Sequence, residues 1–264
     1  MRRDAFVPGD GLAAPLSGGG RVTISAMSER YVSPAQAELE RYWQLAPSQI
    51  RNPVAQSFEV SPTAVVPILY RAETGLLELV VARWGLIPLW WKESKRPRNT
   101  FEACSEEAAT KPIWRYPMTK SRCLVPALGW FEWQETQRPD PASGELKRLH
   151  QRYLMRKVDR EPMAFAGLMS RRILTGEKPE FSCAILTRDA VGAAAAVHDR
   201  MPVALAKDAE AAWLDPELTD AALMIEFARD NAITDFLVHL VDAGVQEASG
   251  AASARSGGAL ADPT

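Results

Sequence analysis

The sequence predicts a globular protein that contains both strands and helices. A strand pair is expected at 63–70 and 76–84, because two apolar, β-branched runs flank a short connection that contains Gly75. A helix is expected from Ser33 to about Pro47, where Leu39 and Trp43 recur at helical spacing. Hydrophobic residues make up 47% of the 264 residues and charged residues 24%, which is ordinary globular composition. A chain of this length can form one large domain or two small ones.

The first helix is expected to use Ser33 as its N-cap and Pro34 as its first residue. The remaining expected elements follow in chain order: an extended piece at 58–63, an aromatic loop at 84–91, a short helix at 106–114, a strand-forming stretch at 122–133, an exposed polar loop at 134–148, strands at 151–155, 164–168 and 181–186, a turn and helix start at 187–190, helices at 207–214 and 219–231, and a late strand at 235–241. The strand at 181–186 is rich in apolar residues and alternates little, so it is expected to be central and buried.

The overall composition excludes several classes of protein. The formal net charge of −2 gives no global electrostatic case for nucleic-acid binding, so such binding would need a local basic patch. The three Cys and three His residues are scattered, without a CxxC pair, which favours neither a disulfide scaffold nor a metal site. A reducing cytoplasm, and no cofactor, are the resulting expectations.

Both ends of the sequence are rich in small residues. Residues 1–26 are predicted to be a flexible leader and residues 246–264 a flexible tail, which leaves a folded body at 27–245. The beginning lacks the apolar region of a secretory signal, and no stretch approaches the roughly 20 apolar residues needed to cross a bilayer. No membrane association is therefore expected.

The stretch 122–133, R-C-L-V-P-A-L-G-W-F-E-W, holds the first candidate site residue. In a strand, Trp130 and Glu132 would share one face, and Phe131 and Trp133 the other. A carboxylate held among aromatic rings is partly desolvated, which disfavours its charged form and suits proton transfer. The alternative is that Glu132 lies on a solvated strand face with an exposed edge.

Two other stretches carry candidate functional residues. The loop W-G-L-I-P-L-W-W at 84–91 is followed by Lys92, Lys95, Arg96 and Arg98, and rings beside cations suit single-stranded nucleic acid. The alternative is a loop that covers the core next to an ordinary solvated charge run. His198 lies in a polar triplet with Asp199 and Arg200, which could both set its charge, although a lone His is more often structural.

Several motifs together resemble the SOS-response-associated peptidase (SRAP) family, whose members cross-link to abasic sites in single-stranded DNA. The matching pieces, in family order, are W-G-L-I-P-L-W-W, Asn99, R-C-L-V-P-A-L-G-W-F-E-W, A-F-A-G-L, S-C-A-I-L-T and V-H-D-R-M-P-V. The resemblance implies a single α+β domain with a curved, barrel-like antiparallel β core and peripheral helices. It also implies a DNA groove that leads to a compact site.

The resemblance also implies roles for individual residues. In the family, an N-terminal Cys exposed by removal of the initiator Met condenses with the aldehyde of an abasic deoxyribose, assisted by an Asn, a Glu and a His. Asn99, Glu132 and His198 match these three residues by motif. Arg30 and Arg200 match family arginines, and Trp90 and Trp91 match the loop that wedges against DNA bases. 

This chain also departs from the family pattern. Ser28 occupies the position of the nucleophilic Cys and is preceded by other residues. The family motif N-A-R-x-E-T is N-T-F-E-A-C here, so Phe101 replaces a phosphate-binding Arg and could instead offer a stacking surface to DNA. Glu59 replaces an Asn of the motif Y-N-V-A-P. A serine hydroxyl is a far poorer nucleophile than a thiol near neutral pH.

Three functions remain open on the sequence. The chain could form a Schiff base between a Ser28 α-amine and an abasic site in single-stranded DNA, it could cleave itself between Met27 and Ser28, or it could bind DNA without chemistry. Cys104 is not expected to replace the missing thiol, because its own α-amine is in a peptide bond. We expect a monomer that acts without a metal or small-molecule cofactor in the bacterial cytoplasm or nucleoid.

Overall fold

The computed structural model describes residues 30–140, 143–173 and 179–242. The expected leader at 1–26 and tail at 246–264 therefore lie outside the described residues, as does Ser28. The helices are α1 (Gln36–Trp43), α2 (Ser105–Ala108), α3 (Pro112–Lys120), α4 (Glu210–Trp213) and α5 (Ala221–Asp230), with short 3-10 turns η1 (Pro47–Gln49), η2 (Gly192–Ala196) and η3 (Lys207–Ala209).

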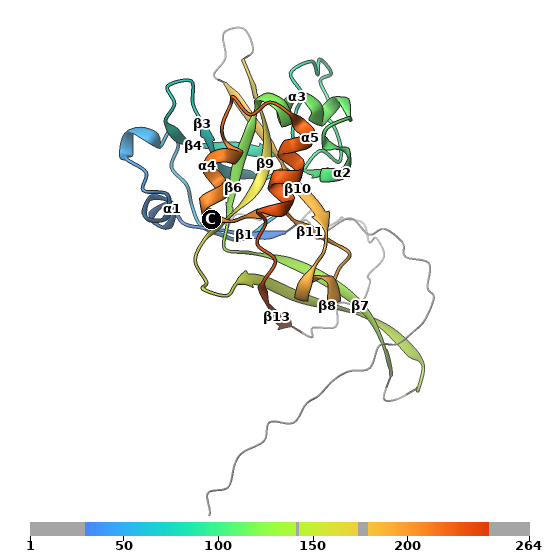
Figure 1. Ribbon diagram of the computed structural model, residues 1–264. Coiled ribbons are helices and arrows are strands. Elements are labelled where there is room, and N and C mark those ends of the chain that lie inside the picture. Colours follow the sequence, from blue (N-terminus) through green and yellow to red (C-terminus); the bar gives the residue numbers. More distant parts are fainter. Residues whose placement is uncertain (1–29, 141–142, 174–178, 243–264) are drawn as a thin grey trace, which may run out of the picture.

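A closed ring of strands forms the centre of the fold (Figure 1). Its members, in the order in which they pair around the ring, are β3 (Val65–Arg71), β4 (Leu77–Trp84), β10 (Glu180–Asp189), β9 (Met163–Arg172) and β6 (Arg122–Ala127). Three short strands extend it: β5 (Glu102–Cys104) and β11 (Arg200–Pro202) pair with β10, and β12 (Ala204–Leu205) pairs with β9. The expected α+β fold with a curved, barrel-like core is confirmed, although β10 pairs in parallel with β4 and β5.

A second, antiparallel sheet lies beside the barrel, below it in Figure 1. Its strands, in spatial order, are β13 (Phe236–Asp242), β8 (Leu146–Lys157), β7 (Gly129–Pro139), β1 (Tyr31–Ser33) and β2 (Ser57–Val60). Only Leu128 separates β6 from β7, so the central stretch of the sequence passes directly from the barrel into this sheet. The two halves of that stretch thus contribute to two different layers.

Residues of the barrel strands alternate between two hydrophobic clusters, as the two-residue period of a strand requires. On β6, Cys123 and Val125 belong to one cluster and Leu124 to the other. The cluster of Leu124 also contains Trp213 of α4, so the helices cover the outside of the barrel. The cluster of Cys123 contains Trp130 of β7, so the barrel interior is continuous with the packing face of the second sheet.

Gly167 of β9 marks the tightest point of the barrel interior. A Cβ atom at this position would lie 2.7 Å from Sγ of Cys123, the residue that pairs with it across β6 and β9. Glycine is needed because a larger residue would overlap the sulfur. Burial raises the pKa of the thiols of Cys123 and Cys183, which lie in this same cluster, so both are inert thiols in the folded protein.

Several sequence predictions are confirmed. The strand pair appears as β3 and β4, and Gly75 in its turn has a φ of +81°, a conformation that favours glycine. The strand expected to be central, β10, pairs with β4, β5, β9 and β11, and its residues from Ser182 to Thr187 are buried. The last two helices and the late strand correspond to α4, α5 and β13.

One helix prediction was wrong at its start, and another treated two helices as one. Ser33 ends β1, where it pairs with Ser57, and the cap of α1 is Ala35, whose N–H donates to the Glu38 carboxylate at 2.9 Å. The pairing of β1 between two other strands overrides the local signal of Ser33 and Pro34. The helix expected at 106–114 is two helices, because Pro112 lacks an N–H and starts α3 instead of continuing α2.

Two loop predictions were also wrong. The polar segment 134–148 is the distal part of a hairpin, in which β7 and β8 pair as far as Pro139 and Leu146. Both faces of this ribbon meet solvent, so the alternation that marks a half-buried strand is missing. The turn expected at 187–190 is still strand, because Thr187, Arg188 and Asp189 pair with β11.

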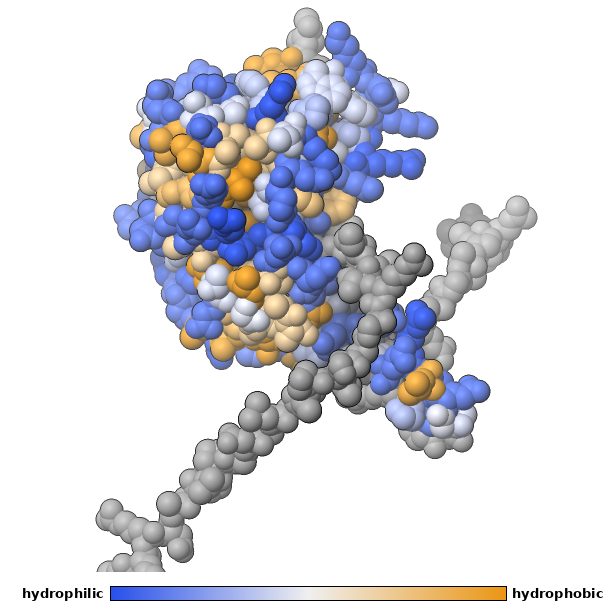
Figure 2. All heavy atoms as spheres, turned by 45° about the vertical axis from the view of Figure 1, so that its right-hand side comes forward, coloured by the Kyte–Doolittle hydropathy of each residue, from blue (hydrophilic) through white to orange (hydrophobic). Residues whose placement is uncertain are grey.

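The surface is mixed in character. In Figure 2 hydrophilic side chains cover much of the visible face, with apolar patches between them, as is usual for a globular protein. Large apolar side chains that stay exposed include Leu89 at 50%, Trp90 at 57% and Tyr116 at 54%. Within the described ranges, none of the helices is long and apolar enough to span a membrane.

Candidate functional site

Glu132 is buried in the second sheet. It lies on β7 with 1% of its surface exposed, on the same face as Trp130, which is also 1% exposed. Trp130 makes edge contacts with Phe165 of the barrel at 6.2 Å and with Phe236 of β13 at 4.8 Å between ring centroids. The alternative of a solvated face is therefore wrong, and the Glu132 carboxylate lies in the aromatic environment that the alternation predicts. Its chemical role stays a prediction.

His198 follows the η2 turn and is held from both sides. Its backbone N–H donates to the Ala194 carbonyl at 3.1 Å, and its imidazole is 9% exposed. Its Nδ1 accepts from the Arg200 N–H at 3.0 Å, and Oδ1 of Asp199 also lies 3.0 Å from Nδ1. These two contacts conflict, since the first needs a lone pair on Nδ1 and the second needs a proton there. We favour the first, because the backbone N–H is fixed while the Asp199 side chain is 46% exposed and free to turn away.

Gln134 connects the strand of Glu132 to the turn that precedes His198. Gln134 lies two residues after Glu132 on β7, and its Nε2 donates to the Ala196 carbonyl at 2.8 Å. Its Oε1 accepts from the Tyr153 hydroxyl at 3.2 Å, and Tyr153 is the cross-strand partner of Glu132. These contacts fix η2 against the edge of β7, which brings the two candidate proton-transfer groups to the same region of the fold.

Asn99 lies at the surface, in the segment between β4 and β5. Its φ of +54° is in the left-handed region, which asparagine tolerates better than most residues. The chain just after it is fixed, because the Phe101 carbonyl accepts from the Trp84 indole N–H at 2.9 Å and from the Ile185 N–H at 2.8 Å. Asn99 is therefore an exposed amide on a rigid support.

A cavity of about 500 Å³ opens beside Asn99. Arg83, Arg96 and Arg98 line it, and its lining includes no carboxylate. Arg96 pairs with Glu180 at 2.7 Å, whereas Arg83 donates to the Thr63 carbonyl at 2.9 Å. Burial, and then the nearby Arg96, lower the pKa of Arg83. Sequence reasoning missed Arg83, although a cation just before the buried Trp84 was a visible signal.

Phe101 is partly buried and packs against the barrel core. Its ring meets Trp84 edge-on, with centroids 6.2 Å apart and planes at 83°. Part of the ring is therefore engaged in the core, which leaves less of it for the DNA stacking that its position in the motif suggests. That stacking role stays a prediction.

Trp90 and Trp91 project from the loop after β4. Their ring centroids lie 5.8 Å apart, and the Trp91 indole N–H donates to the Lys95 carbonyl at 2.9 Å. Arg172 donates to the Trp91 carbonyl at 3.1 Å, which fastens the loop to β9. Trp90 is 57% exposed, so its ring is available to a ligand. A base could stack on it at low cost.

Arg30 is engaged by the carboxylate that departs from the family motif. Its Nη1 lies 2.7 Å from Oε1 of Glu59, and Nη2 of Arg152 lies 3.2 Å from the same oxygen. The Arg152 guanidinium stacks over Phe131 at 3.7 Å from the ring centroid. The Arg30 carbonyl accepts from the Phe131 N–H at 2.9 Å, so the described chain begins next to β7.

Arg200 joins three elements of the barrel side. Its guanidinium donates to both carboxylate oxygens of Glu106 at 3.0 Å, to Asp189 at 2.7 Å and to the Thr187 hydroxyl at 3.2 Å. Its side chain is only 17% exposed. A DNA phosphate would have to compete with two carboxylates for this arginine, so the structure favours a clamp between α2, β10 and β11. Its expected role in DNA binding is not tested.

Residues close in sequence to Arg30, Asn99, Glu132 and His198 belong to one core cluster or pack against it. Tyr31, Trp84 and Trp130 belong to the cluster, and Phe101 and Val197 pack against it. Tyr31 contacts Trp84 edge-on at 5.3 Å and pairs with Trp130, so it connects the side of Asn99 to the strand of Glu132. No group of His, Cys, Asp and Glu suited to a metal ion occurs in the part of the chain that the structure describes.

Trp90 lies apart from this cluster. It lines a different cavity together with Ile113 and Tyr116, next to α3. Cys104 precedes α2 and is half-buried, and it belongs to neither arrangement.

Comparison with known proteins identifies relatives in several organisms. The chain is 34% identical over 138 residues to the protein of Bacillus subtilis named abasic site processing protein YoqW, an alignment that covers 52% of this chain and 58% of YoqW. It is 26% identical to abasic site processing protein YedK of Escherichia coli, over 76% of this chain and 81% of YedK. The mouse abasic site processing protein HMCES is 26% identical over 60% of this chain and 53% of HMCES. The chain therefore spans little more than half of the length of the first of these relatives.

Solved structures share the fold. A phage-related protein of Bordetella bronchiseptica is 28% identical, with a TM-score of 0.60, over 81% of this chain and 93% of that one. A protein of Bacteroides thetaiotaomicron is 21% identical with a TM-score of 0.56, over 80% of this chain and 84% of that one, which shows a common fold alone. The sequence model of the family described as SOS response associated peptidase (SRAP) matches residues 20–248. This chain therefore belongs to the SRAP family.

Proposed function

We propose that this protein processes abasic sites in single-stranded DNA through the α-amine of residue 28. The observation that carries the proposal is the buried Glu132 carboxylate, on the strand whose Gln134 binds the turn that precedes His198. The cationic cavity beside Asn99 offers groups that can bind a DNA backbone. The printed names of the relatives, abasic site processing proteins, support the same substrate. The cavity arginines suit the phosphates that flank a missing base.

The chemistry needs a free amine, which arises if Met27 is the start of the mature chain or if the preceding segment is removed. With a reference pKa of about 7.7–8.0, part of an α-amine is neutral at pH 7. Its nitrogen attacks the C1′ aldehyde carbon of the opened sugar, and the carbinolamine then loses water to form an imine. Glu132 and His198 carry the protons of these steps, and the Asn99 amide orients the amine. Removal of a C2′ proton would then form a C2′–C3′ double bond and break the C3′–O bond. The DNA fragment on the 3′ side leaves with a 5′ phosphate, and the unsaturated sugar stays on the imine.

Borohydride trapping tests the proposal, because borohydride reduces an imine to a stable secondary amine. Chains that begin at Met1 and at Ser28 are each mixed with single-stranded DNA that contains one abasic site. We expect a trapped adduct with the Ser28 chain, a reduced yield in Glu132→Gln, and an unchanged yield in Glu135→Gln, an exposed carboxylate on the same strand. Absence of any adduct with either chain would end the proposal.

Self-cleavage between Met27 and Ser28 is one route to the free amine. The Ser28 hydroxyl would attack the preceding carbonyl, with Glu132 or His198 as the base. Intact-mass spectrometry of the purified chain tests this route. A chain that still begins at Met1 after long incubation excludes it, without excluding removal by another protease.

A binding module without covalent chemistry is the second candidate. Two observations favour it: Ser28 replaces the thiol, and Phe101 replaces the phosphate-binding arginine of the family motif. Equal affinity for intact and abasic single-stranded DNA, with a steep salt dependence and no adduct, would select this candidate. Both candidates assume a monomer in the bacterial cytoplasm or nucleoid, which light scattering and fractionation would test.

A further inference from the structure

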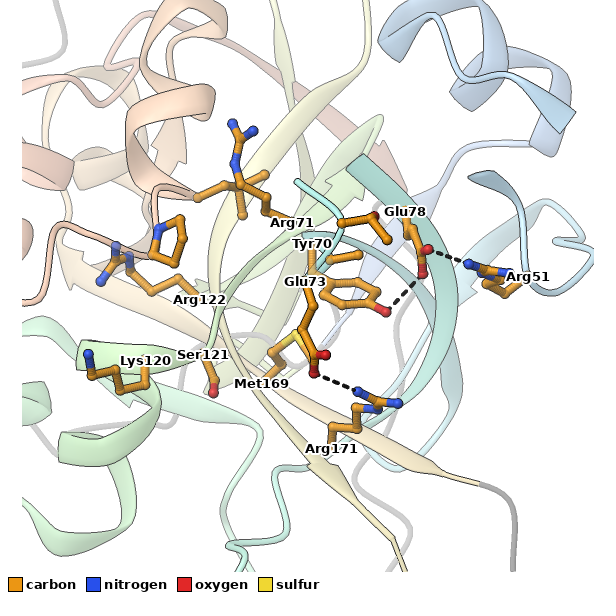
Figure 3. Close-up of a pocket in the computed structure, with 14 residues that line it drawn as sticks. Arg51, Tyr70, Arg71, Glu73, Glu78, Lys120, Ser121, Arg122, Met169 and Arg171 are labelled. Carbon is orange, nitrogen blue, oxygen red and sulfur yellow. Dashed lines mark hydrogen bonds and ion pairs between the residues drawn. The ribbon is translucent and has the colours of Figure 1, made fainter. Parts of the chain in front are cut away.

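A second cationic cavity lies away from the cluster that holds Trp130 and Tyr31. It occupies about 340 Å³ at the end of the barrel where β3 turns into β4 and where β6 begins (Figure 3). Five cationic side chains line it, Arg51, Arg71, Lys120, Arg122 and Arg171, against two carboxylates, Glu73 and Glu78. The whole chain carries a formal charge of −2, so this excess of positive charge is local.

The two carboxylates neutralise only part of this charge. Glu78 is bound by Arg51 and accepts from the Tyr70 hydroxyl at 2.9 Å. Glu73, whose side chain is 95% exposed, lies 3.5 Å from Arg171 and forms a weak ion pair. Among the residues that the structure describes, Arg71, Lys120 and Arg122 have no carboxylate within ion-pair distance. The cavity therefore retains cations that are not offset.

Arg122 is the buried member of this set. It is 7% exposed, and its guanidinium donates to the backbone carbonyls of Met118, Trp213 and Asp215 at 2.6–2.8 Å. Burial lowers the pKa of Arg122, although the charge of Asp215 opposes this effect. Three of its five N–H groups are used, so two remain for a ligand. A fixed guanidinium held only by carbonyls would gain from an anion in the cavity.

Other groups on the wall suit a phosphate in particular. Ser121, between Lys120 and Arg122, brings a hydroxyl that can donate to a phosphate oxygen, and Figure 3 shows its side chain among those of Lys120 and Met169. Arg71 and Lys120 are both exposed, and they come from β3 and from the end of α3. Cationic side chains from separate elements, together with a hydroxyl, supply the donors that bind a phosphate.

This cavity adjoins the one beside Trp90. Glu73, Ser121, Met169 and Arg171 line both cavities, and the second, of about 530 Å³, extends to Leu89, Trp90 and Tyr116. A nucleic-acid strand that stacks on the exposed Trp90 ring could therefore reach the cationic cavity with a phosphate.

We propose that the cavity between Arg71, Lys120, Ser121 and Arg122 is a second phosphate-binding site, separate from the cavity beside Asn99. The phosphate comes either from DNA that has passed Trp90 or from a free phosphate or nucleotide. The DNA source rests on the function proposed above, whereas binding of free phosphate does not.

Inorganic phosphate tests the site on the full chain. Binding to the folded state raises the melting temperature by mass action, compared with chloride at equal ionic strength. We expect this rise in the wild type and in Arg229→Glu, a control that reverses one exposed charge on α5. The rise should vanish in the double variant Arg71→Glu/Lys120→Glu. An equal rise in all three proteins would overturn the proposal, as would no rise in the wild type.

The neutral variant Arg71→Gln/Lys120→Gln is the control for misfolding. It should lose most of the phosphate-induced rise in melting temperature while keeping the wild-type circular dichroism.

Salt-dependent binding of a long single-stranded DNA identifies the source of the phosphate. If DNA fills the site, the slope of log K against log salt should weaken by about 0.7 in either double variant, because roughly 0.7 is lost with each phosphate contact. An unchanged slope with a lost phosphate effect assigns the site to free phosphate. Adduct yield on a short abasic DNA should stay at the wild-type value in either case.

Discussion

Replacing Arg200 by Met separates two roles that this arginine can have. The family motif assigns it to DNA, whereas its contacts with Glu106, Asp189 and Thr187 make it a clamp. Met keeps the length of the side chain and removes the charge and all donors. If Arg200 is a clamp, the variant should lose stability and keep its salt-dependent affinity for single-stranded DNA.

The size of the loss follows from the contacts. Hydrogen bonds to charged groups contribute about 1.5–3 kcal/mol when buried, but exposed ion pairs contribute only about 0.2–1 kcal/mol. The side chain of Arg200 is 17% exposed, while those of Glu106 and Asp189 are 51% and 84% exposed, so solvent screening applies. We therefore expect a loss of roughly 1–2 kcal/mol, which lowers the melting temperature by about 2–8 °C for a domain of this size. Arg229→Met, on an exposed arginine with one weak ion pair, should change it by less.

The pH dependence of the melting temperature provides a second test of the Arg200→Met variant. Burial, the largest single effect, raises the pKa of Glu106. The hydrogen bonds and charge of Arg200, together with hydrogen bonds from the backbone and from Ser105, outweigh it and leave the pKa below its ordinary 4.5. The pKa of this carboxyl is lower in the folded protein than in the unfolded one, so its ionised form stabilises the fold at pH values above the unfolded pKa. This stabilisation is lost as the pH falls through the folded pKa. The difference in melting temperature between wild type and variant should shrink below about pH 4.5. A variant that melts like the wild type at pH 7 but loses about 0.7 from its DNA salt slope would refute the clamp.

Three further predictions concern the cluster near Arg30, the barrel interior and the thiols. Glu59→Gln removes the carboxylate that binds Arg30 and Arg152. Affinity for single-stranded DNA, measured by fluorescence anisotropy at low salt, should therefore rise about 2- to 10-fold, and a fall in affinity would contradict this prediction. Gly167→Ala should lower the free energy of unfolding in urea by about 1–3 kcal/mol, because its Cβ would lie 2.7 Å from Sγ of Cys123. The loss should be smaller in a Cys123→Ala background, and an equal loss there would disprove the contact. Cys104 should react with a thiol reagent in the native protein. Cys123 and Cys183 should react only on unfolding, because burial raises the pKa of both thiols. Rapid reaction of all three cysteines in the native protein would show that the barrel is open.

Local patterns predicted the parts of the fold in which sequence and packing agree. The alternation at Trp130–Trp133 put Glu132 on the face of Trp130 and left its burial open, and Gly75 marked the turn between β3 and β4. The ring closure of the barrel, by contrast, depends on pairings between distant strands such as β9 and β10. No local pattern encodes such a pairing, so the barrel was predicted only through the resemblance to the family.

The wrong predictions share a physical cause, which is that tertiary pairing outweighs local preference. Ser33 has the chemistry of an N-cap but lies in β1, and the polar residues from Gln134 onward form a ribbon that needs no apolar face. Residue types in the candidate site could be predicted from the motifs, but their partners could not. Nothing in the motif indicates that Glu59 binds Arg30 or that Glu106 binds Arg200, because these partners come from distant segments.

The location of the trapped adduct tests whether the α-amine of residue 28 reacts with the abasic site. Peptide mapping by mass spectrometry, after borohydride reduction of the Ser28 chain on abasic single-stranded DNA, identifies the nitrogen that holds the sugar. We expect the adduct on the α-amine of Ser28, with a lower yield in Glu132→Gln. An adduct on a surface lysine, formed equally well by Glu132→Gln, would contradict a role for Ser28 and Glu132.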